Sequence, residues 1–289
     1  MKTSIDYEIL EAEIIRKLEE KIDPTSADRV RQVRVILRMH LLSYFRSPSD
    51  ERLEGSFLHL CKALGEITDL KIEGREHFEI TPSIIIGNHL GANKLVKVPV
   101  ASGAHEFSPE RFDFQKNRLK NDDHFMMLFF PFVETIRRAC EGRKILPIPI
   151  LMQYEDLLGL YATSHGFVMT QENGLRRMQA ICSQVEKKIE FAITDDAIPY
   201  VIIFPEGGTS GKLSSHGPYD LENFYSGFLS LSERFSLKIQ PVVCAFSKSF
   251  QFFSRIVGYQ NTSDEKRALV DYFSKRMQCS LNELVRKIA

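Results

Sequence analysis

The spacing of hydrophobic residues along the chain changes near residue 68. Before this point, apolar residues recur every three or four positions, which is the spacing of helices with one buried face. Three helices are predicted there, separated by breaks at Pro24 and Pro48, and the last runs to about Leu64. The pattern therefore predicts a helical region over residues 1–67.

After residue 68, short apolar runs alternate with helical patterns. The runs Ile84–Ile86, Ile198–Phe204 and Ile239–Phe246 are rich in β-branched residues, which is typical of strands buried on both faces. Helices are predicted over about residues 175–189, 226–235 and 264–288. This alternation predicts an α/β domain over residues 68–289, with a mixed, mostly parallel sheet flanked by helices and the helical region as an N-terminal appendage.

Composition narrows the classes of function. Lys plus Arg and Asp plus Glu number 38 each, so the chain lacks the basic excess of a general nucleic-acid binder. The five cysteines are scattered and none forms a CxxC pair, so neither a metal site nor a disulfide framework is predicted. Such cysteine usage is typical of the cytoplasm, which is the localisation we expect.

The hydrophobic segments are too short to cross a membrane. Residues 1–6 contain no apolar signal segment. The most apolar runs, Phe125–Val133 and Ile145–Met152, fall well below the roughly 20 residues that a membrane-spanning helix requires. We therefore expect a soluble chain that at most lies on a membrane surface. The second predicted helix carries Arg34 and Arg38 on its polar side, where they either pair with the acidic first helix or dock an acidic carrier protein or anionic lipid.

Two stretches place polar residues and glycines directly after a strand-like run. Asn88 and His89 follow the first run, and Glu206, Gly207 and Gly208 follow the second. In open α/β sheets, ligands bind just beyond the carboxyl ends of the strands. His89 is a candidate general base because an imidazole titrates near neutral pH. The two glycines are candidates to let the backbone approach a ligand and to present N–H groups to an oxyanion.

Together these stretches resemble the glycerolipid acyltransferase family, which carries an Asn-His-x4-Asp block after one strand and a Phe-Pro-Glu-Gly-Thr-Arg-Ser block after another. The resemblance covers roughly residues 68–250. It implies transfer of an acyl chain from an acyl carrier protein or coenzyme A thioester to a hydroxyl or amine, as in phospholipid biosynthesis, with no separate cofactor. His89 would be the general base, Glu206 the anchor of its loop, and Gly207 and Gly208 the oxyanion and loop elements.

The chain departs from the family pattern at three counted positions. Lys94 stands where the family has an aspartate that orients the histidine, and Glu172 and Thr209 stand where it has arginines that hold the acceptor's phosphate. A carboxylate repels a phosphate and attracts an ammonium group, so these changes favour an amine or an uncharged hydroxyl acceptor. The predicted substrate-binding residues are Asn88, Lys94, Glu172, Thr209 and Lys212.

The departures leave alternatives open. Arg176, Arg177 and Lys212 would rebuild a phosphate site from shifted positions. Lys94 is either a surface residue or a contact to an anionic substrate, and some other group then orients His89. A lysine at this position also favours a non-catalytic relative that binds acyl chains or a carrier protein, and a membrane-surface adaptor is the third alternative.

A long segment separates the two motif stretches. His89 and Glu206 are 206 − 89 = 117 positions apart, more than compact members of the family need. The excess falls at about residues 96–144. It is predicted to be either a surface loop with a helix packed over the sheet or a cap that shapes the acyl pocket.

Overall fold

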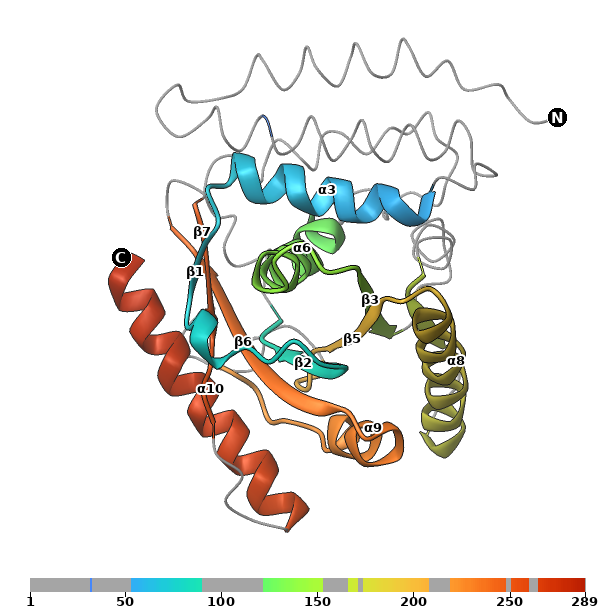
Figure 1. Ribbon diagram of the computed structural model, residues 1–289. Helices are drawn as coiled ribbons and strands as arrows, with labels where there is room; N and C mark the ends of the chain where they lie inside the picture. Colours follow the sequence, from blue (N-terminus) through green and yellow to red (C-terminus); the bar gives the residue numbers. More distant parts are fainter. Residues whose placement is uncertain are drawn as a thin grey trace, which may run out of the picture.

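The computed structural model describes residue 32 and residues 53–89, 122–152, 166–170, 174–207, 219–247, 251–259 and 265–288 (Figure 1). Its centre is a seven-stranded sheet in the order β1-β7-β6-β2-β5-β3-β4. All neighbouring strands run parallel except β6 and β7, which are antiparallel. The predicted mixed, mostly parallel sheet is therefore confirmed. The strands are β1 (Lys71–Glu73), β2 (Ser83–Gly87), β3 (Ile145–Met152), β4 (Val168–Thr170), β5 (Ile198–Ile203), β6 (Lys238–Phe246) and β7 (Phe252–Ile256).

Helices cover both faces of this sheet (Figure 1). One face packs against α6 (Asp122–Ala139), and α3 (Leu53–Ile67) packs on α6 and shares its hydrophobic cluster. The opposite face packs against α8 (Gly174–Thr194), α9 (Gly227–Phe235) and α10 (Lys266–Ile288). A short 3₁₀ turn, η1 (Arg75–His77), follows β1. The result is a three-layer arrangement in which the central strands are buried on both faces.

The apolar runs read from the sequence are explained by this double burial. In β2, Ile85 joins the hydrophobic cluster of α3 and α6, whereas Ile84 and Ile86 join the cluster of the other three helices. All three isoleucines are fully buried. Successive side chains of a strand point to opposite faces, so a strand covered on both sides needs apolar residues at every position.

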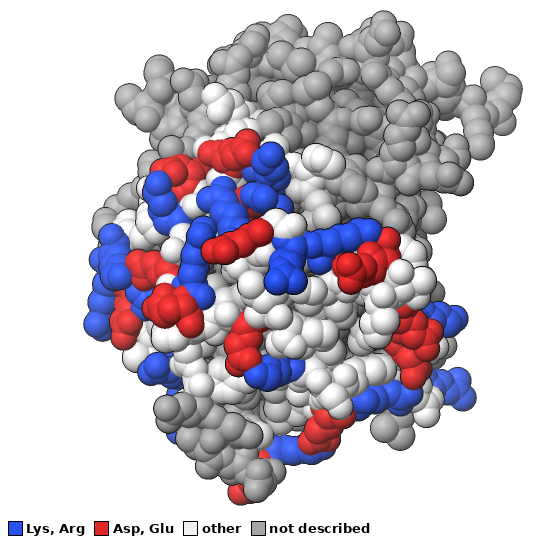
Figure 2. All heavy atoms as spheres, in the orientation of Figure 1, with Lys and Arg blue, Asp and Glu red and all other residues white. Residues whose placement is uncertain are grey.

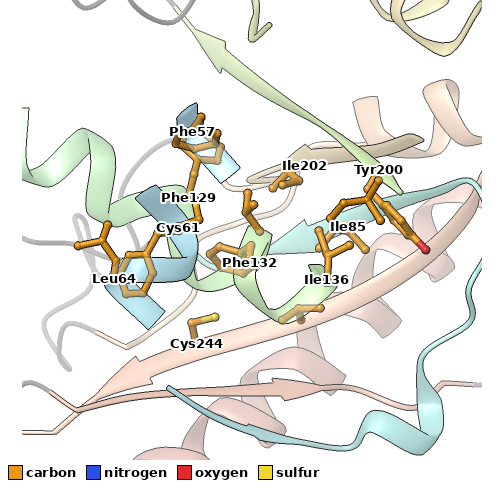
Figure 3. Close-up of a cluster of buried hydrophobic side chains, with 14 of the residues drawn as sticks. Phe57, Cys61, Leu64, Ile85, Phe129, Phe132, Ile136, Tyr200, Ile202 and Cys244 are labelled. Carbon is orange, nitrogen blue, oxygen red and sulfur yellow. The ribbon is translucent and has the colours of Figure 1, made fainter. Parts of the chain in front are cut away.

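The cluster between the sheet and α6 is rich in aromatic rings. Phe129, Phe130 and Phe132 of α6 are fully buried. Figure 3 shows Phe129 and Phe132 together with Phe57 of α3 and with Tyr200 and Ile202 of β5. These rings fill the space between the two helices and the strands that lead to the predicted site.

α6 forms most of the described part of the segment at residues 96–144. It is a core helix packed over the sheet, and its buried side chains form part of the main hydrophobic cluster. Residues 122–139 thus form a helix packed over the sheet, and the cap that shapes the acyl pocket stays a prediction. The rest of the segment up to residue 121 lies outside the described residues.

The boundary predicted at residue 67 marks a change of secondary structure, not a gap between two cores. Phe57, Leu60, Cys61 and Leu64 of α3 are buried in the same cluster as α6 and the sheet. α3 therefore packs as part of the α/β unit. The two helices predicted before it lie outside the described residues.

β3, β4 and β7 were not predicted as strands. β3 coincides with the apolar run Ile145–Met152, which is short because it is a buried strand. β4 has only three residues. β7 alternates buried and half-buried residues and pairs antiparallel to β6. β4 and β7 are short and lie at or near the margin of the sheet, where sequence signals are weak. The apolar run of β3 cannot be told from a buried helix segment by periodicity alone.

Candidate active site

The two motif stretches meet because their strands are neighbours in register. β2 and β5 pair in parallel, with Ile86 opposite Ile203. His89 and Glu206 each lie three residues beyond that pair. The carboxyl ends of parallel strands lie at the same edge of a sheet, so the two residues come together although 117 positions separate them.

This edge is also a topological switch point. The helix that follows β2 in the described chain is α6, on one face of the sheet, whereas the helix that follows β5 is α9, on the opposite face. Where adjacent parallel strands lead to helices on opposite faces, the loops diverge and a ligand can bind between them. The position of His89 and Glu206 is thus one where α/β proteins place binding sites.

Glu206 links the two loops and a third segment. Its Oε1 accepts the backbone N–H of His89 at 3.0 Å, and its Oε2 accepts the backbone N–H of Glu222 at 2.8 Å. The side chain is only 5% exposed. A buried carboxylate is stable only when such donors satisfy it. Both oxygens are engaged in holding backbone, so this geometry gives Glu206 the role of an anchor.

Asn88 joins β2 to its other neighbour, β6. Its Nδ2 donates to the carbonyl oxygen of Cys244 at 3.0 Å, and its Oδ1 accepts the N–H of the same residue at 2.8 Å. The side chain is fully buried. Asn88 was predicted to bind substrate, but its amide groups bond to the protein backbone here. Burial also raises the pKa of the Cys244 thiol, which disfavours the thiolate that a nucleophilic cysteine needs.

Aromatic packing holds the His89 ring. The ring meets Phe204 edge to face, with 5.2 Å between ring centroids and 70° between planes. Phe204 in turn contacts Phe129 and Phe132 of α6 at 5.0 and 5.4 Å. His89 is half-buried, and its Nδ1 is a buried atom. The imidazole is thereby attached to the rigid core of the molecule.

Gly207 has a conformational role that the sequence only suggested. Its φ is +63°, a backbone conformation that favours glycine. Its N–H donates to the carbonyl oxygen of Phe204 at 3.1 Å, which closes the turn after β5. In this geometry the N–H serves the turn, so it does not support the predicted role of Gly207 as an oxyanion donor.

The remaining predicted site residues lie outside the described residues: Gly208, Lys94, Glu172, Thr209 and Lys212. The two arginines of the alternative phosphate site are described. Arg176 and Arg177 lie in the first turn of α8, and Arg176 is exposed.

A third segment at this edge was missed by the sequence analysis. Residues 219–225, which we call the site strap, precede α9 and bond to the loop that carries Pro205 and Glu206. Besides the bond from Glu222, the N–H of Tyr225 donates to the carbonyl oxygen of Pro205 at 2.8 Å. The hydroxyl of Tyr219 donates to the carbonyl oxygen of Phe246 at 3.1 Å and accepts its N–H at 3.2 Å. Burial raises the pKa of Tyr219 to about 12, so the hydroxyl stays protonated and can make both bonds.

No sequence signal points to this strap, because its contacts use mostly backbone groups. Among the described residues, no cluster of three or more His, Cys, Asp or Glu side chains is arranged to hold a metal ion. Within the same part of the chain, no helix is long and apolar enough to span a membrane.

Comparison with known proteins adds one distant likeness. No protein-family model matches the chain, and no curated protein matches it. Among solved structures, it is similar to the 1-acyl-sn-glycerophosphate (LPA) acyltransferase PlsC from Thermotoga maritima, with 14% sequence identity and a TM-score of 0.45. The match covers 96% of this chain and 97% of that one. These values are too low to transfer an activity.

Proposed function

We propose that this protein is an acyltransferase. It moves an acyl chain from an acyl carrier protein or coenzyme A thioester to a hydroxyl or amine acceptor, with His89 as general base. The observation that supports this most directly is the hydrogen bond between the His89 backbone and Glu206, at the carboxyl edge shared by β2 and β5. It brings together the two motifs that resemble those of glycerolipid acyltransferases.

The chemistry needs one base and a fixed geometry. The imidazole takes the proton from the acceptor hydroxyl or amine as the acceptor attacks the thioester carbonyl. A carbon–oxygen or carbon–nitrogen bond forms, the carbon–sulfur bond breaks, and the released thiolate takes up a proton. Glu206 anchors the loop that carries the base, and Phe204 holds its ring. The thioester is the substrate, and no other cofactor is part of the proposal.

The acceptor class follows from positions that the resemblance identifies. With Glu172 and Thr209 where arginines hold a phosphate in the resembled family, we propose an amine or an uncharged hydroxyl acceptor. The protein is proposed to act in the cytoplasm, with contact to a membrane surface when its acceptor or product is a lipid. Figure 2 shows basic and acidic side chains interspersed over the described part of one face. Among the described residues, Lys144 pairs with Asp195 and Lys238 with Glu79.

The test is an assay of thiol release. Purified full-length protein is incubated with palmitoyl thioesters of coenzyme A and of acyl carrier protein, with glycerol, an amino alcohol or glycerol phosphate as acceptor. We expect acceptor-dependent release of free thiol with one of the first two acceptors and little with glycerol phosphate. Brisk acylation of glycerol phosphate would contradict the acceptor assignment, and no release with any acceptor or donor would contradict the transferase.

The role of His89 is tested in the same assay. We expect His89→Ala to lower turnover by about a hundredfold or more, the scale of general-base catalysis. His59→Ala is the matched control, because His59 is an exposed residue of α3. Circular dichroism should show both variants folded. Turnover close to the wild-type value in His89→Ala would remove His89 from the mechanism.

A further inference from the structure

One side chain of α10, Gln278, forms hydrogen bonds to the backbone of the site strap. Gln278 accepts the N–H of Leu221 through Oε1 at 2.7 Å. Its Nε2 donates to the carbonyl oxygen of Tyr219 at 3.1 Å, and also to Oδ1 of Asn282 at 2.8 Å. The amide thus pairs with an N–H and a carbonyl of the strap, as a neighbouring strand would.

α10 provides a rigid support for this side chain. Phe273, Met277 and Leu281, on the turns that flank Gln278, are buried against the sheet. Met277 and Leu281 are fully buried. A side chain held on a packed helix positions its partners more precisely than one on a loop. The hydrogen bonds of Gln278 therefore attach the strap to a helix that is packed into the core.

From the strap, the contacts continue to His89. The N–H of Glu222, next to Leu221, donates to Oε2 of Glu206, whose Oε1 accepts the N–H of His89. Glu206 is almost completely buried, so losing the Glu222 donor would remove one of the hydrogen bonds that stabilise its carboxylate away from water. The carboxylate would then turn towards other donors, and the backbone of His89 would lose its anchor.

We infer that Gln278 is a positioning residue for His89. It fixes the strap, the strap orients Glu206, and Glu206 holds the backbone that carries the imidazole. The effect on geometry is independent of the reaction, whereas the effect on turnover rests on the proposed function. Gln278 contacts neither motif loop directly, so it acts through the strap and not on the substrate.

The experiment measures hydrogen exchange at the His89 amide in the full chain. Labelling with ¹⁵N-histidine gives at most eight amide signals, and the His89 signal is identified by its loss in His89→Ala. Gln278→Ala should increase the exchange rate of this amide by about tenfold, since the supporting hydrogen bonds are lost. Gln179→Ala, the same substitution at an exposed position of α8, should leave the rate unchanged.

A second variant guards against general damage to the fold. Gln278→Glu keeps an acceptor for the N–H of Leu221 and loses the donor to Tyr219, so its exchange rate should lie between those of the wild type and Gln278→Ala. If Gln278→Ala is misfolded by circular dichroism, Gln278→Glu decides the matter alone. A His89 exchange rate equal to the wild-type rate in a folded Gln278 variant would overturn the inference.

Turnover gives the second readout. We expect Gln278→Ala to lower kcat by about tenfold or more with KM little changed, because the base is displaced and the substrate contacts are not. A wild-type protein without transferase activity, together with faster exchange in the variant, would refute the proposed function and leave the positioning role of Gln278 intact. If the protein is active but the exchange rate of the His89 amide does not change in the Gln278 variants, the positioning role of Gln278 is refuted and the proposed function stands.

Discussion

The absence of a side chain at Gly87 lets the ring of Phe132 pack close to the backbone next to the candidate base. Gly87 ends β2 directly before Asn88 and His89. A Cβ at this position would lie 2.5 Å from Cε1 of Phe132, inside van der Waals contact. The ring of Phe132 also contacts Phe204, which packs on His89. The absence of a side chain at residue 87 therefore permits the aromatic packing behind the candidate base.

This geometry predicts the effect of Gly87→Ala. The methyl group would displace the Phe132 ring, and overpacking of this kind costs about 1–3 kcal/mol of unfolding free energy. Denaturant unfolding measures the loss. Gly227→Ala is the control, because a Cβ there meets only Sδ of Met178 at 3.8 Å. A Gly87→Ala protein as stable as the wild type would show that the ring moves without cost.

At the scale of elements, ion pairs attach α10 to the edge of the sheet. Glu73 of β1 accepts hydrogen bonds from Arg255 of β7 at 2.6 Å and from Lys287 of α10 at 2.9 Å. Desolvation by itself raises the pKa of the Glu73 carboxyl, but the hydrogen bonds from Lys287 and Arg255 outweigh it, so the pKa is lowered from 4.5. One carboxylate thus connects the first strand, the last strand and the last helix.

The lowered pKa of Glu73 makes this attachment sensitive to acid. A group whose pKa is lower in the folded state stabilises the fold above its unfolded pKa, here about 4.5, and that stabilisation is lost as the pH falls through the folded value. We therefore expect the difference in unfolding free energy between the wild type and Glu73→Gln to be largest above about pH 5 and to shrink on acidification.

Denaturant unfolding across this pH range measures that difference. Glu190→Gln, which removes an exposed carboxylate of α8, gives the baseline. A difference that stays constant down to about pH 3 would show that Glu73 does not gain its stabilisation from the charged form.

Across the whole molecule, two hydrophobic clusters on opposite faces of one sheet make the described chain a single packed unit. α3 belongs to the first cluster and precedes every strand. Its place in the core means that the α/β part is incomplete without residues that the sequence pattern assigned to the N-terminal region.

A truncated chain of residues 68–289 tests this. It lacks Phe57, Leu60 and Leu64, each of which contributes about 1.5–3 kcal/mol by burial. The summed loss is comparable with the about 5–15 kcal/mol of a whole folded protein. We expect the truncated chain to aggregate or to lack a cooperative unfolding transition. A soluble fragment with cooperative thermal unfolding would place the domain boundary where the hydrophobic pattern changes.

The local pattern of the chain was enough to predict its fold class and its central elements. β2, β5 and β6 were visible as apolar runs, and α8, α9 and α10 as helical periodicities, because those periods record which side chains are buried. The same reading located His89 and Glu206 after two strands. It assigned roles to residues such as Lys94 and Glu172, which lie outside the described residues, and those roles stay predictions.

Which elements meet was decided only by the tertiary structure. Periodicity shows that a face is buried but not what buries it, so the strand order that makes β2 and β5 neighbours cannot be read from either strand. For the same reason the pairing of the Asn88 amide with the backbone of Cys244, 156 positions away, could not be predicted from the sequence. The strap and Gln278 carry no local signal at all, because hydrogen bonds between backbone and a distant side chain depend on where the folded chain brings them together.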